Sequence, residues 1–260
     1  MISVLLQGGL GNQLFQVAAA ASIAKDINTD ICLSPNNHTL NLQGNSVISY
    51  KTNVFSKINF VDSNLILKRL ELYNEVSFSY KEIIKKDNLL LNGYFQSEKY
   101  FASQKEHIKL LYSETEYIKN YIEENYNYID FKNSASIHVR RGDYLKFPKI
   151  HPTCDLEYYK YCINNLEKYD NLLIFSDDIN WCKKNLKYNN ITFIENEPDY
   201  IDLYLMSRCR DNIIANSSFS WWAAWLNNNS DKKVFCPSIW FGTSGPQDYQ
   251  DIFCEGWIKV

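Results

Sequence analysis

The 260-residue sequence contains no hydrophobic stretch long enough to cross a bilayer. A membrane-spanning helix needs about 20 consecutive, mainly apolar residues. Residues 1–7 form a short apolar run without the basic start that a secretory signal peptide requires. We therefore expect a cytoplasmic protein, and the sequence leaves open a peripheral contact with the inner face of the cytoplasmic membrane.

The chain also has no excess of positive charge. Its 27 Lys and Arg residues against 30 Asp and Glu give a formal net charge of −3 at pH 7. Proteins that bind nucleic acid generally carry a basic surface. We therefore expect no general affinity for DNA or RNA, although a small local cluster of cations is compatible with this charge.

The seven cysteines are scattered, and no two of them have the C-x-x-C spacing. That spacing is typical of structural zinc sites and of redox dithiols. Neither kind of site is expected, and unpaired cysteines fit a reducing compartment. The sequence gives no indication of an oligomeric state.

A glycine-rich turn follows the first apolar run. Residues 2–6 predict a strand, residues 8–13 read Gly-Gly-Leu-Gly-Asn-Gln, and apolar residues at helical spacing follow. The order resembles the start of a nucleotide-binding half, although the spacing is not that of the G-x-G-x-x-G motif. We single out Gly9, Gly11 and Asn12, because glycine lets a ligand approach the backbone and an amide can bind phosphate or a sugar. A tight turn without a ligand is the alternative.

The second half of the chain alternates strands with helices. Strands are predicted over residues 135–138, 172–175, 191–194, 212–215 and 234–236, and helices over residues 155–169, 179–186, 200–208 and, after residue 220, through residues 221–225. Such alternation predicts a parallel sheet with helices on both faces. The first half is less regular, with strands predicted over residues 29–33 and from 88, and helices over residues 65–73, 97–112 and 114–128.

A compact group of charged residues follows the strand predicted over residues 135–138. His138, Arg140, Arg141 and Asp143 lie within six positions. In open α/β sheets, ligands bind beyond the carboxyl ends of the strands, and the planar fork of arginine matches phosphate oxygens. We infer a site for a phosphorylated ligand, above all a diphosphate. An exposed ion pair between one arginine and Asp143 is the alternative.

Polar residues also follow two other predicted strands. Asp177 and Asp178 come after residues 172–175, and the group Asn216, Ser217 and Ser218 comes after residues 212–215. Because the carboxyl ends of parallel strands share one edge, we expect these loops to meet the arginine loop. An aspartate can accept the two N–H groups of a guanine edge, and hydroxyls at a helix start can bind phosphate. Helix N-capping is the alternative for both groups.

Four segments resemble the α-1,2-fucosyltransferases of glycosyltransferase family 11. They are Gly8-Gly9-Leu10-Gly11-Asn12-Gln13-Leu14-Phe15-Gln16, His138-x-Arg140-Arg141-x-Asp143-Tyr144, Phe175-Ser176-Asp177-Asp178 and Asn216-Ser217-Ser218-Phe219-Ser220-Trp221-Trp222. They occur in the order of the family and span nearly the whole chain. The H-x-R-R-x-D element alone is shared more widely, including with α-1,6- and protein O-fucosyltransferases. The tryptophans, at helical spacing, are predicted to belong to the core rather than to a sugar platform.

The resemblance implies an α/β fold of the GT-B type, with two Rossmann-like halves, parallel sheets and the active site in the cleft between them. Residues 1–130 would form the acceptor-side domain and residues 131–260 the domain that binds GDP-fucose. The implied reaction transfers L-fucose from GDP-β-L-fucose to the 2-hydroxyl of a terminal galactose on a surface glycan or oligosaccharide, with inversion. No metal or other cofactor is expected. Transfer to another linkage and a non-catalytic sugar- or nucleotide-binding module are the alternatives.

By the matching positions, the resemblance implies that Arg140 and Arg141 hold the diphosphate, and Asp143 completes the predicted catalytic group. Asp177 or Asp178 would face guanine, and Asn12 would reach the donor from the other half. The remaining predicted donor-binding residues are Gly9, Gly11, His138, Asn216, Ser217, Ser218 and Phe219. The general base is left unassigned among Asp143, Glu98, Glu197 and a phosphate oxygen.

Overall fold

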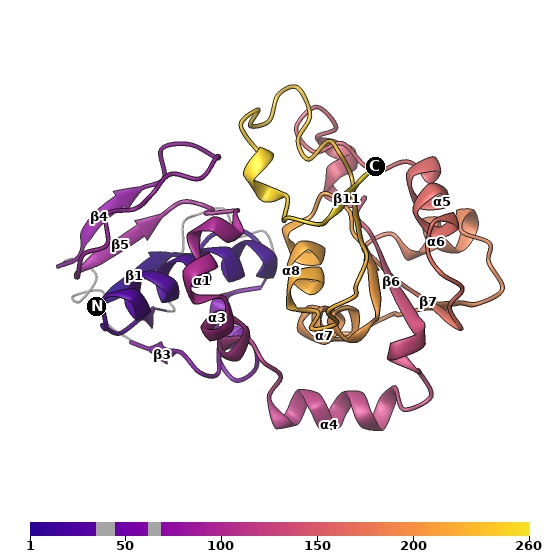
Figure 1. The fold of residues 1–260 in the computed structure, drawn as a ribbon, viewed down its shortest axis with the longest axis horizontal. Coiled ribbons are helices and arrows are strands. Elements are labelled where there is room, and N and C mark those ends of the chain that lie inside the picture. Colours follow the sequence, from indigo (N-terminus) through magenta and orange to yellow (C-terminus); the bar gives the residue numbers. More distant parts are fainter. Residues whose placement is uncertain (35–44, 62–68) are drawn as a thin grey trace. The chain divides into compact units, whose positions relative to one another are not determined.

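The computed structural model describes residues 1–34, 45–61 and 69–260 (Figure 1). Contacts divide the chain into two compact units. Unit 1 comprises Met1–Tyr117 and Asp248–Cys254, and unit 2 comprises Ile118–Gln247 and Glu255–Val260. The boundary predicted from the sequence, between residues 130 and 131, falls later than this division, and the return of the chain to unit 1 was not part of that prediction.

Unit 1 is built on short parallel strands. Its strands are β1 (Ile2–Leu5), β2 (Cys32–Leu33), β3 (Asn59–Phe60), β4 (Glu71–Asn74) and β5 (Leu89–Asn92). One sheet has the order β1-β5-β4, β2 pairs with β3, and a parallel bridge between Ile2 and Ile31 connects the two groups. Helix α1 (Leu10–Asp26) is buried on nearly all sides, which its run of four alanines, Ala18 to Ala21, allows by letting neighbours pack closely.

Two predictions for unit 1 were inaccurate. The helix predicted over residues 65–73 lies partly outside the described residues, and its described end forms strand β4, because pairing with β5 decides the local structure. The helix predicted over residues 97–112 is divided into shorter pieces, although Ser97 does accept a hydrogen bond from the Lys99 amide as a cap. The helical segments of this unit are η1 (Val47–Tyr50), η2 (Glu98–Tyr100), η3 (Ala102–Gln104), α3 (Lys105–Leu111) and η6 (Gln250–Ile252).

Unit 2 contains one sheet of six parallel strands. They are β6 (Ser134–Val139), β7 (Asn171–Ser176), β8 (Ile191–Phe193), β9 (Asp211–Ile213), β10 (Val234–Cys236) and β11 (Ile258–Lys259). Their order is β11-β10-β9-β6-β7-β8. Counted along the chain this is the 3-2-1-4-5-6 order of the doubly wound nucleotide-binding fold, in which the order reverses beside the first strand. The predicted parallel sheet of the second half is confirmed.

Helices lie on both faces of this sheet, as Figure 1 shows. They are α5 (Leu156–Asn164), α6 (Ile179–Asn185), α7 (Asp199–Arg208) and α8 (Ser218–Leu226). Helix α4 (Glu116–Asn125) precedes the sheet in the chain and lies apart from it. Ala135, Ile137 and Val139 of β6 share a core with residues of α5 and α6. The alternate residues Ser136 and His138 face the other side, where Ser136 accepts from Asn212 and the His138 ring meets Phe219 of α8.

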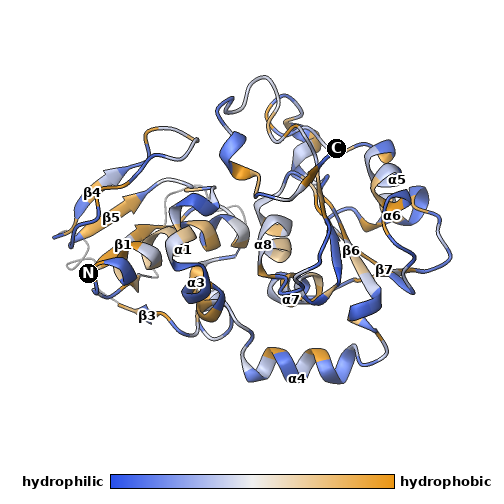
Figure 2. Ribbon diagram, viewed as in Figure 1, coloured by the Kyte–Doolittle hydropathy of each residue, from blue (hydrophilic) through white to orange (hydrophobic). Residues whose placement is uncertain are grey.

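The tryptophans of α8 belong to the core, as predicted. Trp221 and Trp222 are fully buried, and their ring centroids lie 5.1 Å apart. Figure 2 shows the hydrophobic colour concentrated on the central strands, while helix α4 is largely hydrophilic. Within the described residues, no helix has the length and apolar character needed to span a membrane. All seven cysteines are free thiols.

Helix α7 carries a carboxylate that has lost most of its contact with water. Oδ1 of Asp202 is buried and has no hydrogen-bond partner within the described part of the chain. Burial, and after it the nearby carboxylates of Glu197 and Asp199, raise the pKa of Asp202 to about 8. Glu197 is itself held by the hydroxyls of Tyr121 and Tyr126, which donate at 3.0 and 2.7 Å.

We predict that Asp202→Asn stabilises the protein at pH 8 by roughly 1–3 kcal/mol, the usual cost of an unsatisfied buried polar group. The folded-state pKa lies above the ordinary value of 3.8, so the native state keeps a proton that the unfolded chain releases. Stability from this group therefore falls as the pH rises from about 4 to about 8. Urea unfolding should show a larger gain at pH 8 than at pH 5, with the exposed Asp231→Asn as control. A gain of the same size at both pH values would contradict the assignment.

Candidate functional site

The loops that follow β6, β7 and β9 meet at the edge of the unit 2 sheet where the strand order reverses. The Arg141 amide donates to Oδ1 of Asp177 at 2.9 Å, which joins the loops after β6 and β7. The Tyr144 hydroxyl donates to the Asn216 carbonyl at 3.0 Å, which joins the loops after β6 and β9. Ligands of doubly wound sheets bind at this position. The predicted meeting of the three loops is confirmed.

Arg140 is held by two carboxylates. Its Nη2 lies 2.6 Å from Oδ1 of Asp143, and its Nη1 lies 2.9 Å from Oδ2 of Asp177. The guanidinium also lies 5.3 Å from the centre of the Tyr144 ring. The ion pair between Arg140 and Asp143 that the sequence offered as an alternative is therefore present, and Asp143 orients the arginine fork.

Arg141 is held at one end and open at the other. Its Nε donates to Oδ2 of Asp178 at 3.1 Å, and its guanidinium stacks 4.3 Å from the centre of the Trp181 ring. The side chain is 17% exposed. Among the described residues, none accepts a hydrogen bond from its terminal Nη atoms. A planar group positioned in this way presents its remaining N–H donors to an anion with little loss of side-chain freedom.

The two aspartates after β7 bind the arginines, and one of them also caps the next helix. Asp178 caps helix α6, because its Oδ1 accepts from the Trp181 amide at 3.2 Å. The capping alternative is therefore correct for Asp178. Asp177 uses one oxygen for the Arg141 amide and the other for Arg140. Recognition of guanine by either residue stays a prediction.

Three contributors to this cluster were not singled out from the sequence. A Cβ atom on Gly142 would lie 2.6 Å from Oδ2 of Asp177, so only glycine permits this close approach. The Trp181 ring stacks against the Arg141 guanidinium, and the Tyr144 hydroxyl links the loops after β6 and β9. Gly142 and Tyr144 belong to the segment that carries the arginines, so their place in the sequence could have identified them as part of the site. Trp181 lies in the helix that follows the Asp177 loop.

His138 lies near the end of strand β6, just before the arginines in the sequence, and is neutral. It is 5% exposed, and burial followed by the charge of Arg140 lowers its pKa to about 3. Its ring lies edge-on to Phe219, with the ring centroids 5.6 Å apart. Its Nδ1 has no hydrogen-bond partner within the ranges that the structure describes. A neutral imidazole offers one donor and one acceptor, so His138 can bind a ligand but carries no charge at neutral pH.

The Asn216 side chain fixes the loop after β9. Both amide protons of Asn216 are taken, since Nδ2 donates to the carbonyls of Pro152 and Trp240 at 2.9 Å each. The side chain therefore ties the loop to two other segments, and donor binding by Asn216 stays a prediction. Ser217 is the N-cap of α8 without a side-chain capping bond, and Ser218 begins the helix. The backbone N–H groups of a helix start attract anions.

In unit 1 the glycine turn requires glycine at Gly8, because its φ is +75° and a Cβ atom would lie 2.2 Å from Nδ2 of Asn12. Ligand binding at Gly9 and Gly11 stays a prediction. Gly9 has extended backbone and caps α1, and Gly11 is buried in the helix. The Asn12 side chain accepts from Nε2 of Gln96 at 2.8 Å. The turn therefore positions Asn12 at the end of the sheet.

No cluster of three or more His, Cys, Asp or Glu side chains suited to a metal ion occurs in the described part of the chain. The expectation of a metal-independent reaction stays a prediction. Of the other carboxylates considered from the sequence, Glu197 is bound by two tyrosine hydroxyls.

Comparison with known proteins agrees with this geometry. The family model described as "Glycosyl transferase family 11" matches residues 32–260. An α-1,2-colitosyltransferase from Escherichia coli is 32% identical over 283 residues, covering 98% of this chain and 97% of the relative. The O-antigen biosynthesis glycosyltransferase WbnK from Escherichia coli is 29% identical over 301 residues, covering 98% and 99%.

Solved structures with a similar fold are fucosyltransferases. NodZ from Bradyrhizobium has a TM-score of 0.56 at 12% identity, covering 85% of this chain and 90% of its own. The apo form of POFUT1 has a TM-score of 0.52 at 11% identity, covering 90% and 96%. The predicted GT-B type of α/β fold with parallel sheets is confirmed by these likenesses. The length and identity of the sequence matches together show that the chain belongs to glycosyl transferase family 11 and is a glycosyltransferase.

Proposed function

We propose that the protein transfers L-fucose from GDP-β-L-fucose to the 2-hydroxyl of a terminal galactose, with inversion and without a metal. The acceptor in this proposal is a bacterial surface glycan or its oligosaccharide precursor. The observation that carries the proposal is Arg141, whose guanidinium is fixed by Asp178 and Trp181 while its terminal N–H groups stay available.

The chemistry of the transfer requires such a group. When the bond between the sugar and the diphosphate breaks, negative charge develops on the leaving phosphate. Donors that are already in position stabilise this charge without reorganisation, and this is usually the largest single contribution to catalysis. Arg141 supplies the open fork, and Arg140 beside it adds a second fixed cation. The start of helix α8 adds backbone N–H groups at the same sheet edge.

The relatives support both the donor and the acceptor. Galactoside α-(1,2)-fucosyltransferase 1 from Bos taurus is 23% identical over 239 residues, and WbnK is named for O-antigen biosynthesis. NodZ, an α-1,6-fucosyltransferase of similar fold, has been crystallised with GDP and soaked with GDP-fucose. The activities of these proteins support a nucleotide-activated fucose as the donor and a glycan as the acceptor.

A second candidate is transfer of colitose, the 3-deoxy form of fucose. The relative with 32% identity over almost its whole length is named a colitosyltransferase. The two donors share the nucleotide and differ at one hydroxyl. Parallel incubations with GDP-fucose and GDP-colitose on a panel of galactosides, read by mass and linkage analysis, distinguish these candidates. A fucosyl product with an α-1,2 linkage supports the proposal, and transfer of colitose alone contradicts it.

We predict that Arg141→Ala lowers the transfer rate by about 10²–10³, the usual cost of one preorganised donor. Arg141→Lys should also lose most of the activity, because an ammonium group lacks the planar fork. Release of GDP during turnover measures the rate. Arg210→Ala, at the other end of the sheet, is the control, since Arg210 pairs only loosely with Glu167 at 3.7 Å. Equal turnover by Arg141→Ala and the parent would remove the proposed role.

We predict that Gly142→Ala weakens GDP binding by about tenfold, because the new Cβ would push Asp177 away from both arginines. Calorimetry with GDP measures the loss, and an unchanged thermal transition confirms folding. In an Asp177→Ala background, the same glycine substitution should cost much less, since the obstructed carboxylate is gone. Additive losses in the double variant would show that the close approach at Gly142 does not matter.

A further inference from the structure

Unit 2 exposes three large apolar side chains on the short segment that follows its arginine loop. The segment comprises residues 145–150 and reads Leu-Lys-Phe-Pro-Lys-Ile. Leu145 is 51% exposed, Phe147 52% and Ile150 37%, and the residues between them are exposed as well. Single exposed apolar residues are normal on a globular protein, whereas several gathered on one surface mark an interaction site. The segment therefore suits a partner that covers apolar groups.

The first end of this segment is tied to the arginine loop. The Leu145 amide donates to the Arg141 carbonyl at 2.9 Å, and the Phe147 amide donates to the Tyr144 carbonyl at 3.0 Å. These residues form one short helical turn, η5 (Asp143–Lys146). The exposed side chains therefore follow the guanidinium groups of the candidate site within a few residues, on a backbone of defined shape.

The second end rests on the loop that follows β10. The Gly242 amide donates to the Ile150 carbonyl at 3.0 Å, and the Ser244 amide donates to the Lys149 carbonyl at 2.9 Å. A Cβ atom on Gly242 would lie 2.5 Å from the Lys149 carbonyl oxygen, so only glycine allows this close crossing. Because the backbone is held at both ends, little chain entropy is lost when a partner covers the segment.

The local charge is positive although the chain as a whole is negative. Lys146 and Lys149 alternate with the apolar residues, and within the described residues neither ammonium group forms a hydrogen bond or salt bridge. No acidic residue occurs over residues 144–154, nor over residues 232–247, which include the supporting loop. The formal net charge of the whole chain is −3. Two free cations among apolar side chains complement a surface that is both apolar and anionic.

We propose that residues 145–150 form a membrane-contact surface that binds an anionic bilayer. Leu145, Phe147 and Ile150 enter the boundary between the headgroups and the acyl chains, as the apolar residues of interfacial segments do. Lys146 and Lys149 pair with the lipid phosphates, while their methylene stems lie along the apolar surface. Binding of this kind needs neither the donor nor the linkage proposed above.

The composition favours a lipid surface over a protein partner. Lysine is depleted in protein–protein interfaces, whereas two of these six residues are lysines. A stable protein interface also needs roughly 800 Å² on each side, contributed by about 20–30 residues. A bilayer accepts a much smaller segment, provided that apolar groups and cations lie together on it.

Membrane contact at this segment would bring the candidate site close to the lipid headgroups. Arg141 and Leu145 are joined by a backbone hydrogen bond, so the arginine loop cannot lie far from the bound surface. An acceptor that is attached to a lipid would then be concentrated on the same surface as the enzyme, which raises the rate of encounter without any new contact.

The first experiment measures sedimentation of the protein with sucrose-loaded vesicles of phosphatidylcholine, made with and without phosphatidylglycerol. The parent should bind the vesicles that contain the anionic lipid, and added salt should weaken this binding by screening the lysines. The double variant Lys146→Gln, Lys149→Gln should bind about 30-fold more weakly, since each lysine near an anionic surface contributes about fivefold to the affinity.

The matched control is the double variant Lys168→Gln, Lys184→Gln. Lys168 precedes β7 and Lys184 lies in the last turn of α6, so both are exposed toward the edge of the sheet opposite to the arginine loop. The control loses the same charge and should bind as the parent does. Equal weakening of the two double variants would show attraction by net charge alone and overturns the inference. Equally strong binding to phosphatidylcholine alone overturns it too.

The second experiment tests the apolar part of the surface. Phe147→Ser and Leu145→Ser should each weaken vesicle binding by about tenfold, because less apolar area leaves water. Tyr128→Ser, an exposed change before β6, is the control and should bind as the parent does. The thermal transition of each variant should stay close to that of the parent, since the altered side chains are exposed.

Two results of the second experiment contradict the membrane contact. Vesicle binding by Phe147→Ser and Leu145→Ser that equals binding by the parent overturns it. Failure of the parent to bind any vesicle overturns it as well, even where the parent transfers sugar to a soluble galactoside. A parent that binds anionic vesicles but transfers sugar from neither donor supports the membrane contact and contradicts the proposed function alone.

Discussion

The candidate site of unit 2 depends on the pairing of two guanidinium groups with three carboxylates at the end of strand β6. Asp143 and Asp177 hold Arg140, and Asp178 holds Arg141. These pairs cost desolvation, so by themselves they are weak evidence of stability. Their effect is to give each cation one direction before any ligand arrives. The parallel sheet makes this possible, because it brings the ends of strands that are far apart in sequence to a single edge.

Much of unit 2 could be predicted because its signals are local. Strands such as β7 and β10 are short apolar runs, and residues such as Asp155 and Asp178 do cap the helices that follow. The carboxyl ends of parallel strands lie at one edge of a sheet. From this rule the sequence also predicted that the arginine, aspartate and serine loops meet. The order of the strands was not readable, because it depends on which strands pair in three dimensions.

The errors have physical causes that a single sequence does not display. Strand β4 was assigned to a helix because it has only four residues and takes its conformation from β5. The need for glycine at Gly8 was not readable, since the sign of φ is not visible in a run of glycines. The bracing role of the Asn216 side chain was not readable either, because it depends on two segments that are distant in the sequence.

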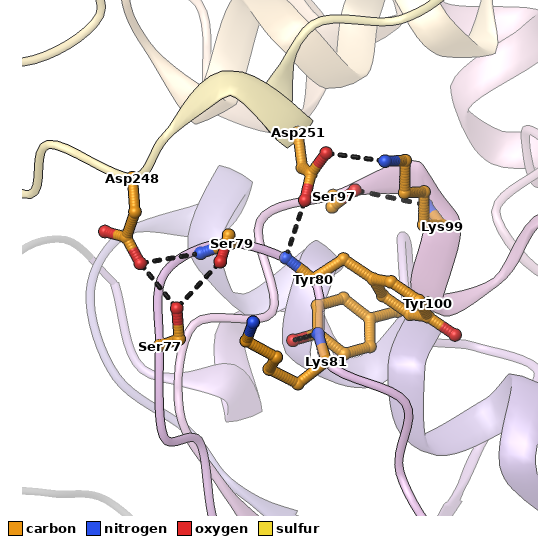
Figure 3. A network of polar contacts seen from close by, with 9 residues as sticks. All are labelled: Ser77, Ser79, Tyr80, Lys81, Ser97, Lys99, Tyr100, Asp248 and Asp251. Atoms are coloured by element: carbon orange, nitrogen blue, oxygen red, sulfur yellow. Dashed lines mark hydrogen bonds and ion pairs between the residues drawn. The ribbon is translucent and has the colours of Figure 1, made fainter.

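The chain crosses from one unit to the other three times, after Tyr117, Gln247 and Cys254. A single cut therefore cannot yield both units whole. Division after Tyr117 would separate the first unit from Asp248 and Asp251, whose contacts secure the loop from Ser77 to Tyr80 (Figure 3). Exchange of the N-terminal unit between relatives would thus need at least two junctions, with the short returning segment transferred together with the N-terminal part.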